Sequence, residues 1–348
     1  MSVPRVRVLV VDDSAVARKV LSEGLASDPR FEVVGAARDA WEARDLIVRH
    51  DPRVITLDVE MPRMDGIEFL RRLMASHPVR AVVVSSLTEK GSQVAMDALR
   101  EGAVEVVAKP TRNLAGGTAA MLSELRTKVL IASTARLQRP VVSSSGPIRR
   151  ALANTTHKLV AIGASTGGTE AIRQVLSDLP PHFPGIAIVQ HMPPGFTAPF
   201  AARLDEVTRF EVKEAVDGDR IFPGRCVVAP AGRQMRVVRS GGDYVAKIGE
   251  STKVSGHCPS VDVMFHSVAS AAGSNAVGML LTGMGADGAD GLGAMRKAGA
   301  KTFAQDEASS VVWGMPRAAW EAGAAERLVA LSKVADTLMS ALEDACLA

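Results

Sequence analysis

Short apolar runs alternate with amphipathic segments along the N-terminal part of the chain. The runs are rich in valine and have the length of buried strands, while the segments between them space their apolar residues as a helix does. Strands that alternate with helices form parallel sheets whose faces are both covered. The pattern predicts a doubly wound α/β domain that closes with a helix at residues 118–135 and has five strands, at residues 5–11, 31–37, 53–58, 80–86 and 104–109.

The same alternation resumes in the C-terminal part, with strands expected at residues 158–163, 185–190 and 276–281. It predicts a second α/β domain with a mostly parallel sheet and a small antiparallel insertion at residues 225–248. Residues 136–156 lack an apolar period and carry Pro, Gly, a Ser run and Arg, but no acid. That composition is typical of a linker. We therefore expect domains at residues 1–135 and 157–348, joined by a flexible linker at 136–156.

Length and composition agree with two domains. The chain has 348 residues, which exceeds the usual size of one core, and 47% of them are hydrophobic. The net charge is only +3, and Lys and Arg are scattered among Asp and Glu instead of forming a tract. We therefore expect no nucleic-acid partner.

The compartment is predicted from the apolar runs and the cysteines. The first apolar run is too short for a signal peptide and ends at Asp12 and Asp13, and no run reaches the length of a membrane span. Cys226, Cys258 and Cys346 lie far apart and form no C-x-x-C pair, which argues against disulfides or a zinc site. We expect a cytoplasmic protein with reduced cysteines and no membrane insertion.

Polar residues collect at the strand ends of the first domain. Asp12 and Asp13 follow the first strand, Asp58 the third, Ser85 the fourth and Lys109 the fifth. In doubly wound sheets these ends meet at one edge. Three carboxylates there suit Mg²⁺, and a lysine and a hydroxyl suit the oxygens of a phosphoryl group. A single strand-end aspartate caps a helix about as often, but the whole set favours phosphoryl chemistry.

The stretches "VLVVDDS", "LDVEMPRMDG", "VVVSS" and "AKP" resemble the receiver domain of two-component response regulators. The resemblance implies that a histidine kinase phosphorylates Asp58 and that Mg²⁺ binds Asp12, Asp13 and Asp58. It also implies a switch hydroxyl at Ser85 and a phosphate-sensing lysine at Lys109.

One position departs from the receiver pattern. Many receivers have an aromatic switch residue where this chain has Val106. A switch in which an aromatic ring swings inward is therefore excluded here. Signal output from the receiver domain must depend on other parts of the surface around this position.

The stretch "GASTGG" opens the second domain between a strand and a helix. Its small residues allow a tight turn that presents Ser165 above the sheet, near the positive end of a helix. This geometry suits a nucleophile with an oxyanion site. A phosphate-binding loop would need a Lys where Thr169 stands, and G-x-G-x-x-G is not matched. A small-residue turn that only packs a helix on its strand remains open.

A serine nucleophile needs a base and an orienting acid. His191 follows the strand at 185–190 and precedes a stiff loop, whereas His257 and His266 are its main competitors. Asp287 lies in a glycine-rich loop after another strand. Asp287 and Asp290 also suggest a calcium loop, but the later glutamate ligand is missing, so a turn is the better interpretation.

Together, "GASTGG", "QHMPPGFT", "CPSVDVMF" and "TGMGADG" resemble the catalytic domain of the chemotaxis protein-glutamate methylesterases, the CheB family. With the receiver motifs, the resemblance covers nearly the whole chain except the linker. It implies Ser165 as nucleophile, His191 as base and Asp287 as orienting acid. The implied substrates are glutamate γ-methyl esters on cytoplasmic helices of chemoreceptors and, in some members, receptor glutamines.

The implied reaction is acyl transfer to Ser165 followed by hydrolysis, which needs no metal or other cofactor. We expect backbone N–H groups to hold the oxyanion, at Thr166, Gly167, Gly168 and Met284. A phosphorylation-activated esterase and a signalling adaptor without turnover are both open. Retention of all three triad residues favours the esterase.

Overall fold

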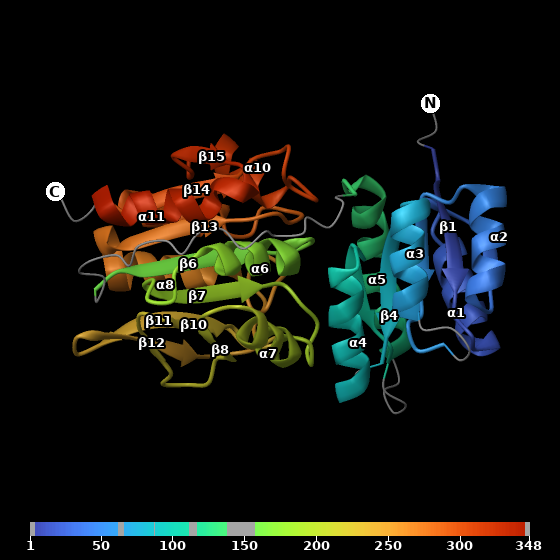
Figure 1. The fold of residues 1–348 in the computed structure, drawn as a ribbon, viewed down its shortest axis with the longest axis horizontal. Helices are drawn as coiled ribbons and strands as arrows, with labels where there is room; N and C mark the ends of the chain where they lie inside the picture. The colour runs from blue at the N-terminus through green and yellow to red at the C-terminus, as the bar shows by residue number, and fades with distance from the viewer. Residues whose placement is uncertain (1–3, 62–65, 87, 111–116, 138–156, 345–348) are drawn as a thin grey trace. The chain divides into compact units, whose positions relative to one another are not determined.

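The computed structural model describes residues 4–61, 66–86, 88–110, 117–137 and 157–344. The chain divides into two compact units, Met1–Val141 and Val142–Ala348 (Figure 1). The predicted linker lies outside the described residues after Leu137, so its flexibility stays a prediction.

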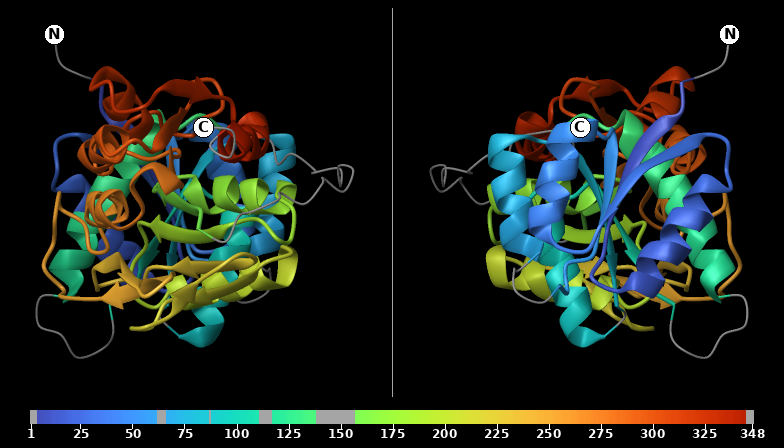
Figure 2. Two further views of the ribbon diagram at one scale, coloured as in Figure 1. Left: turned by 90° about the vertical axis from the view of Figure 1, so that its left-hand side faces the viewer. Right: turned by 90° about the vertical axis from the view of Figure 1, so that its right-hand side faces the viewer.

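The first unit is a parallel sheet with helices on both sides, as the right-hand view of Figure 2 shows. The strand order is β2-β1-β3-β4-β5, and every pair is parallel. The strands are β1 (Val6–Val11), β2 (Phe31–Ala37), β3 (Val54–Leu57), β4 (Arg80–Ser85) and β5 (Glu105–Ala108). The helices are α1 (Ala15–Ala26), α2 (Ala40–His50), α3 (Gly66–Ser76), α4 (Glu89–Arg100) and α5 (Gly117–Thr134).

Local sequence explains these elements. β3 and the inner residues of β1 and β4 are buried, as expected for valine-rich strands covered on both faces. α1 begins after Ser14, whose hydroxyl accepts a hydrogen bond from the Ala17 N–H (3.3 Å). The predicted strands and their parallel arrangement are confirmed. The order of connection reverses between β1 and β3, and such a switch point is where these sheets bind ligands.

The second unit contains a parallel sheet in the order β15-β14-β13-β6-β7-β10-β8 and an antiparallel sheet in the order β11-β12-β9. The strands are β6 (Leu159–Ala164), β7 (Gly185–Gln190), β8 (Glu211–Glu214), β9 (Arg220–Ile221), β10 (Arg225–Val228), β11 (Met235–Ser240), β12 (Asp243–Ile248), β13 (Ala276–Leu280), β14 (Lys301–Gln305) and β15 (Arg327–Val329). The helices are α6 (Gly168–Asp178), α7 (Thr197–Val207), α8 (Val261–Ala272), α9 (Ala289–Lys297), α10 (Met315–Glu321) and α11 (Val334–Asp344), with 3₁₀ turns η1 (Gly273–Asn275) and η2 (Leu331–Lys333).

The predicted fold class is confirmed, with one correction to the insertion at 225–248. Its first strand, β10, is not antiparallel but lies between β7 and β8 in the parallel sheet. Cys226, Val227 and Val228 are fully buried there, which suits a central parallel strand. Only β11 and β12 form the expected hairpin, and β9 joins it.

Helix α8 is central to the second unit because it packs against α9, β11 and β6. Its buried side chains, including Met264 and Phe265, join the apolar core. Gly291 of α9 lets the two helices approach closely. A Cβ at this position would lie 2.7 Å from the Phe265 Cβ and 2.9 Å from the Asp262 carbonyl oxygen.

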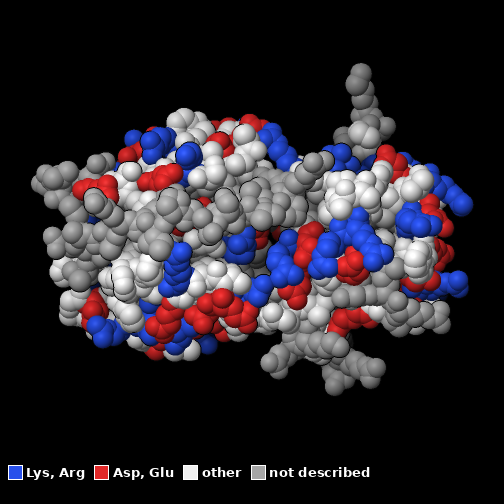
Figure 3. All heavy atoms as spheres, viewed as in Figure 1, with Lys and Arg blue, Asp and Glu red and all other residues white. Residues whose placement is uncertain are grey.

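The surface carries both signs of charge. On the face drawn in Figure 3, Lys and Arg side chains alternate with Asp and Glu side chains over both units. Within the part of the chain that the structure describes, none of the helices has the length and apolar character needed to cross a membrane.

We expect Gly291→Ala to lower the free energy of unfolding of the second unit by about 1 to 3 kcal/mol, because the backbone of α8 cannot yield locally to the added methyl group. Gly293→Ala in the same helix is the control. The added Cβ would make only an ordinary contact, 3.6 Å from the Ala324 Cβ. The higher helix propensity of alanine should therefore raise the free energy of unfolding by at most about 1 kcal/mol. Urea unfolding of both variants is the measurement, and equal effects would contradict the close approach.

Candidate active site

The predicted triad residues come together at one edge of the seven-stranded sheet. β6 and β13 are neighbours, and the chain continues from β6 to β7 on one side and from β13 to β14 on the other. Ser165 directly follows β6, His191 directly follows β7, and Asp287 lies in the loop after β13. This is a topological switch point, where open α/β sheets bind their ligands.

Backbone contacts fix the turn that carries Ser165. The Ser165 N–H donates to the Thr282 carbonyl (3.0 Å), and the Gly168 N–H donates to the Ser165 carbonyl (2.7 Å). Gly167, which precedes α6, has a φ of +77°, a conformation that favours glycine. A Cβ there would also lie 2.6 Å from the Val311 Cβ. The predicted tight turn at Ser165 is therefore present.

Gln190 connects this turn to the strand that carries His191. Its Nε2 donates to the Ser165 carbonyl (2.8 Å) and to the His191 carbonyl (3.1 Å). The side chain is buried, and its Oε1 lies against Gly168, where a Cβ would collide with it. The backbones of Ser165 and His191 are thus held together by one buried amide.

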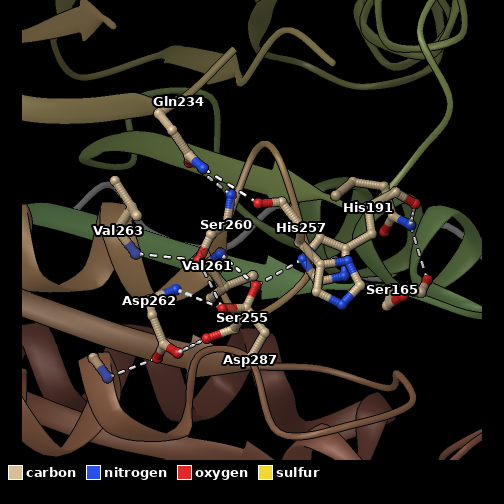
Figure 4. Close-up of polar contacts among 12 residues, drawn as sticks. Ser165, His191, Gln234, Ser255, His257, Ser260, Val261, Asp262, Val263 and Asp287 are labelled. Atoms are coloured by element: carbon tan, nitrogen blue, oxygen red, sulfur yellow. Dashed lines mark hydrogen bonds and ion pairs between the residues drawn. The ribbon is translucent and has the colours of Figure 1, made fainter. Parts of the chain in front are cut away.

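His191 and Asp287 form a short hydrogen bond. His191 Nε2 lies 2.8 Å from Asp287 Oδ2, and the two side chains are 8% and 1% exposed. The other ring nitrogen, Nδ1, is buried and has no hydrogen-bond partner among the described residues. In Figure 4, Ser165 lies beside the His191 ring, on the opposite side from Asp287. Nδ1 is therefore the nitrogen left to interact with the serine.

The first turn of α8 holds the Asp287 carboxylate. Ser260 Oγ (2.7 Å) and the Asp262 N–H (3.2 Å) donate to Oδ1, and the Val261 N–H (2.8 Å) donates to Oδ2 (Figure 4). Burial alone would raise the pKa of Asp287. The hydrogen bond and charge of His191, together with the donors from α8, outweigh burial and lower that pKa. Asp287 is therefore a carboxylate at neutral pH.

The two competing histidines differ sharply. His266 lies on α8, and its half-exposed ring bonds to Asp290 (2.8 Å) and not to a residue of the predicted triad. His257 instead stacks on His191, with ring centroids 3.7 Å apart and planes 4° apart. Burial, and then repulsion from His191 when that ring is protonated, lower the pKa of His257 to about 4.

The predicted oxyanion donors lie around the Ser165 turn. The Gly168 N–H already donates to the Ser165 carbonyl, so it is engaged within the turn. The Gly167 N–H donates no hydrogen bond to the described residues. Met284 follows Gly283, whose backbone lies close to Ser165, since a Cβ added at Gly283 would be 2.7 Å from the Ser165 Cβ. The Met284 side chain is 47% exposed.

The first unit contains the acidic cluster that its strand ends predict. Asp12, Asp13 and Asp58 have ligand atoms within 4.8 Å of one another, and this is the one such group of three among the described residues. Lys109 Nζ lies 2.5 Å from Asp58 Oδ2 and 3.1 Å from Asp12 Oδ2. The Glu60 N–H donates to Asp58 Oδ1 (3.0 Å). Oxygen ligands gathered in this way fit Mg²⁺.

Electrostatics in this cluster favour an additional cation. Burial, reinforced by the charge of Asp58, raises the pKa of Asp12 although Lys109 opposes the shift. Burial would lower the pKa of Lys109, but its hydrogen bonds and charge interactions with Asp58 and Asp12 raise it instead. The cluster thus holds three carboxylates but one ammonium, and a divalent ion would compensate the remaining charge.

Ser85 and Val106 occupy the strand positions that the sequence predicts. The Ser85 hydroxyl is buried and donates to the Gly91 carbonyl in the first turn of α4 (2.9 Å), not to Asp58. Val106 is 3% exposed within β5. The end of β4 is therefore connected directly to α4.

Comparison with known proteins agrees with this geometry. Residues 160–338 match the family model for CheB methylesterase, and residues 8–115 match the response regulator receiver domain. The chain belongs to the CheB methylesterase family. It is therefore an enzyme of the carboxylic ester hydrolase class with an N-terminal receiver domain, which confirms the predicted family.

Relatives in the CheB family are similar over nearly their whole length. Proteins named protein-glutamate methylesterase/protein-glutamine glutaminase are 55% identical in Syntrophotalea carbinolica, over 98% of both chains, and 52% identical in Pseudomonas aeruginosa, over 96% of both. The crystal structure of the Thermotoga maritima CheB methylesterase catalytic domain is 35% identical with a TM-score of 0.52. It matches 53% of this chain and 98% of that one.

Sequence reasoning missed several residues that shape the CheB-type site. Gln190 immediately precedes His191, and Ser260 lies in the motif "CPSVDVMF", so both were within stretches already singled out. His257 was considered only as a rival base. The signal that could have pointed to them is their place next to a strand end or a helix start, where polar side chains orient catalytic groups.

The stability of the protein should depend on pH through His257. Its pKa is 6.5 in an unconstrained chain and about 4 in the fold, where burial, His191 and Lys253 lower it and Asp287 raises it. The contribution of neutral His257 to the free energy of unfolding is complete above pH 6.5. It is lost as the pH falls toward 4, because in this interval the unfolded chain takes up a proton that the folded chain does not. Over this interval the wild type should lose about 1 to 2 kcal/mol more than His257→Phe, a value reduced for partial exposure. Urea unfolding across this range is the measurement, and equal losses would contradict the shift.

Proposed function

We propose that this chain is a phosphorylation-activated protein-glutamate methylesterase that demethylates glutamate γ-methyl esters on chemoreceptors. The observation that supports it most is the pair of buried groups His191 and Asp287, 2.8 Å apart, with Ser165 on the other side of the imidazole (Figure 4). The names of the relatives add the substrate and a second reaction, deamidation of protein glutamine. Since the expected substrate lies on cytoplasmic receptor helices, we place the enzyme in the cytoplasm.

In the proposed reaction, Ser165 Oγ attacks the ester carbonyl while His191 accepts its proton. Because Asp287 bonds to Nε2, the accepting nitrogen is Nδ1. The same nitrogen then protonates the departing methoxide, which leaves as methanol. Water, deprotonated by His191, attacks the glutamyl-serine ester and releases glutamate and Ser165. A glutamine substrate follows the same steps with ammonia as the leaving group.

Asp287 stabilises the imidazolium that forms in each step. It remains a carboxylate because α8 donors and His191 lower its pKa, and its position fixes which nitrogen of His191 carries the hydrogen. The tetrahedral oxyanion is held by backbone N–H groups. Gly167 and Met284 are the donors that we favour, with Thr166 also near the turn and Gly168 already bonded to Ser165.

The first unit supplies regulation in this proposal. A histidine kinase transfers phosphate to Asp58. Asp12, Asp13 and Asp58 would hold Mg²⁺, which would offset the charge of the phosphoryl oxygens. Lys109, already 2.5 Å from Asp58 Oδ2, contacts the phosphate. With Val106 in place of an aromatic ring, the response runs through Ser85, whose bond to the Gly91 carbonyl connects the strand end to α4.

We expect Ser165→Ala to lower methanol release from methylated receptor by on the order of 10⁴ to 10⁶, with the fold intact, because the nucleophile is lost. His191→Ala should be about as damaging, since an unactivated serine hydroxyl is a weak nucleophile. His266→Ala is the matched control, because His266 also bonds to a carboxylate, that of Asp290, but not to a residue of the triad. Near-normal turnover by Ser165→Ala would refute the triad.

Phosphorylation of the receiver should control the activity of the catalytic domain. We expect the unphosphorylated receiver to mask the catalytic site, so that a small-molecule phosphodonor raises methanol release by the wild type but not by Asp58→Asn, which lacks the acceptor oxygen. A fragment of residues 154–348 should be active without phosphodonor. If the fragment is no faster than the unphosphorylated full-length protein, the receiver activates by another route, such as delivery to the receptor.

A further inference from the structure

The ring of His257 stacks face to face on the ring of His191. The centroids are 3.7 Å apart and the planes differ by 4°, and Figure 4 shows the two imidazoles one behind the other. His191 itself has one side-chain hydrogen bond, from Nε2 to Asp287, while Nδ1 has no partner among the described residues. A single hydrogen bond at one edge does not by itself fix the tilt of the ring. The stacked ring of His257 is a flat contact that can restrict this tilt.

Several hydrogen bonds hold the backbone around His257 in place. His257 and Val254 exchange two hydrogen bonds of 2.9 Å as an isolated antiparallel bridge. The buried side chain of Gln234 donates to the His257 carbonyl (3.2 Å) and to the Thr252 carbonyl (2.9 Å), and its Oε1 accepts from the Ser260 N–H (2.9 Å). The segment that presents His257 is thus fixed to the same residue that positions the start of α8.

The ring of His257 is not engaged in hydrogen bonds within the part of the chain that the structure describes. Its nitrogens form no hydrogen bond with the described residues, and with a pKa of about 4 the ring is neutral at physiological pH. A neutral aromatic face is attracted to a cation placed over it. His191 becomes such a cation each time it takes a proton during the reaction.

We propose that His257 is a positioning residue for ester hydrolysis: its ring holds the His191 imidazole in the plane that directs Nε2 to Asp287 and Nδ1 to Ser165, and its face stabilises the imidazolium. This inference rests on the proposed methylesterase function. It assigns to His257 neither proton transfer nor contact with the substrate, so the effect belongs to the chemical step and not to substrate binding.

The test compares aromatic and non-aromatic replacements in the full-length protein, with methanol release from methylated receptor as the assay. His257→Ala and His257→Gln remove the stacked face and should lower kcat by about 10-fold to 100-fold, the cost of a misplaced catalytic group. KM should stay within about twofold. His257→Phe keeps a flat aromatic face on His191 and should retain kcat within about threefold of the wild type.

Controls separate this inference from the proposed function. His266→Ala, which alters a histidine outside the stack, should have wild-type kcat. Melting temperatures identify a variant that fails to fold. If His257→Ala fails to fold, the comparison of His257→Phe with His257→Gln decides whether the positioning role holds. No methanol from the wild type would refute the methylesterase function itself. With an active wild type, an unchanged kcat in His257→Gln, a folded His257→Phe as slow as His257→Gln, or a loss confined to KM would overturn the positioning role.

Discussion

The contact between the first turn of α8 and the Asp287 carboxylate is the interaction on which the rest of the active site depends. A side chain that is 1% exposed keeps its negative charge only if donors replace the water that it has lost. Ser260, Val261 and Asp262 provide those donors, and the helix N-terminus adds its positive potential. With the carboxylate fixed, His191 has one ring nitrogen assigned, and the other is available to Ser165.

That contact in turn requires α8 to be placed accurately. Gly291 allows α9 to lie against the Asp262 backbone, and Gln234 fixes the segment that leads into Ser260. The same amide of Gln234 holds the carbonyl of His257. Gln190 does the equivalent work on the other side, between Ser165 and His191. One buried glutamine thus fixes the loops that carry Ser165 and His191, and the other fixes the segment that carries His257 and Ser260. Such rigid support keeps catalytic groups in their productive geometry.

The sequence predicted the groups that follow strand ends, because a parallel sheet brings those ends together whatever the details of packing. Ser165, His191 and Asp287 were found in this way, as were Asp12, Asp58 and Lys109. The antiparallel assignment of 225–228 was wrong because a short Cys-Val-Val run is compatible with either sheet, and only its neighbours decide. The stacking of His257 and the bond from Ser85 to Gly91 depend on side-chain rotamers and tertiary contacts, which a single sequence does not encode in any local pattern.

The central claim, that Asp287 fixes the orientation of His191, can be measured by ¹⁵N NMR of histidine-labelled full-length protein, with His191→Gln used to assign the signal. The structure predicts that neutral His191 carries its hydrogen on Nε2, facing Asp287, and leaves Nδ1 unprotonated. Asp287→Asn should weaken that preference. A spectrum in which neutral His191 is protonated on Nδ1, or in which Asp287→Asn leaves the tautomer unchanged, would contradict the account.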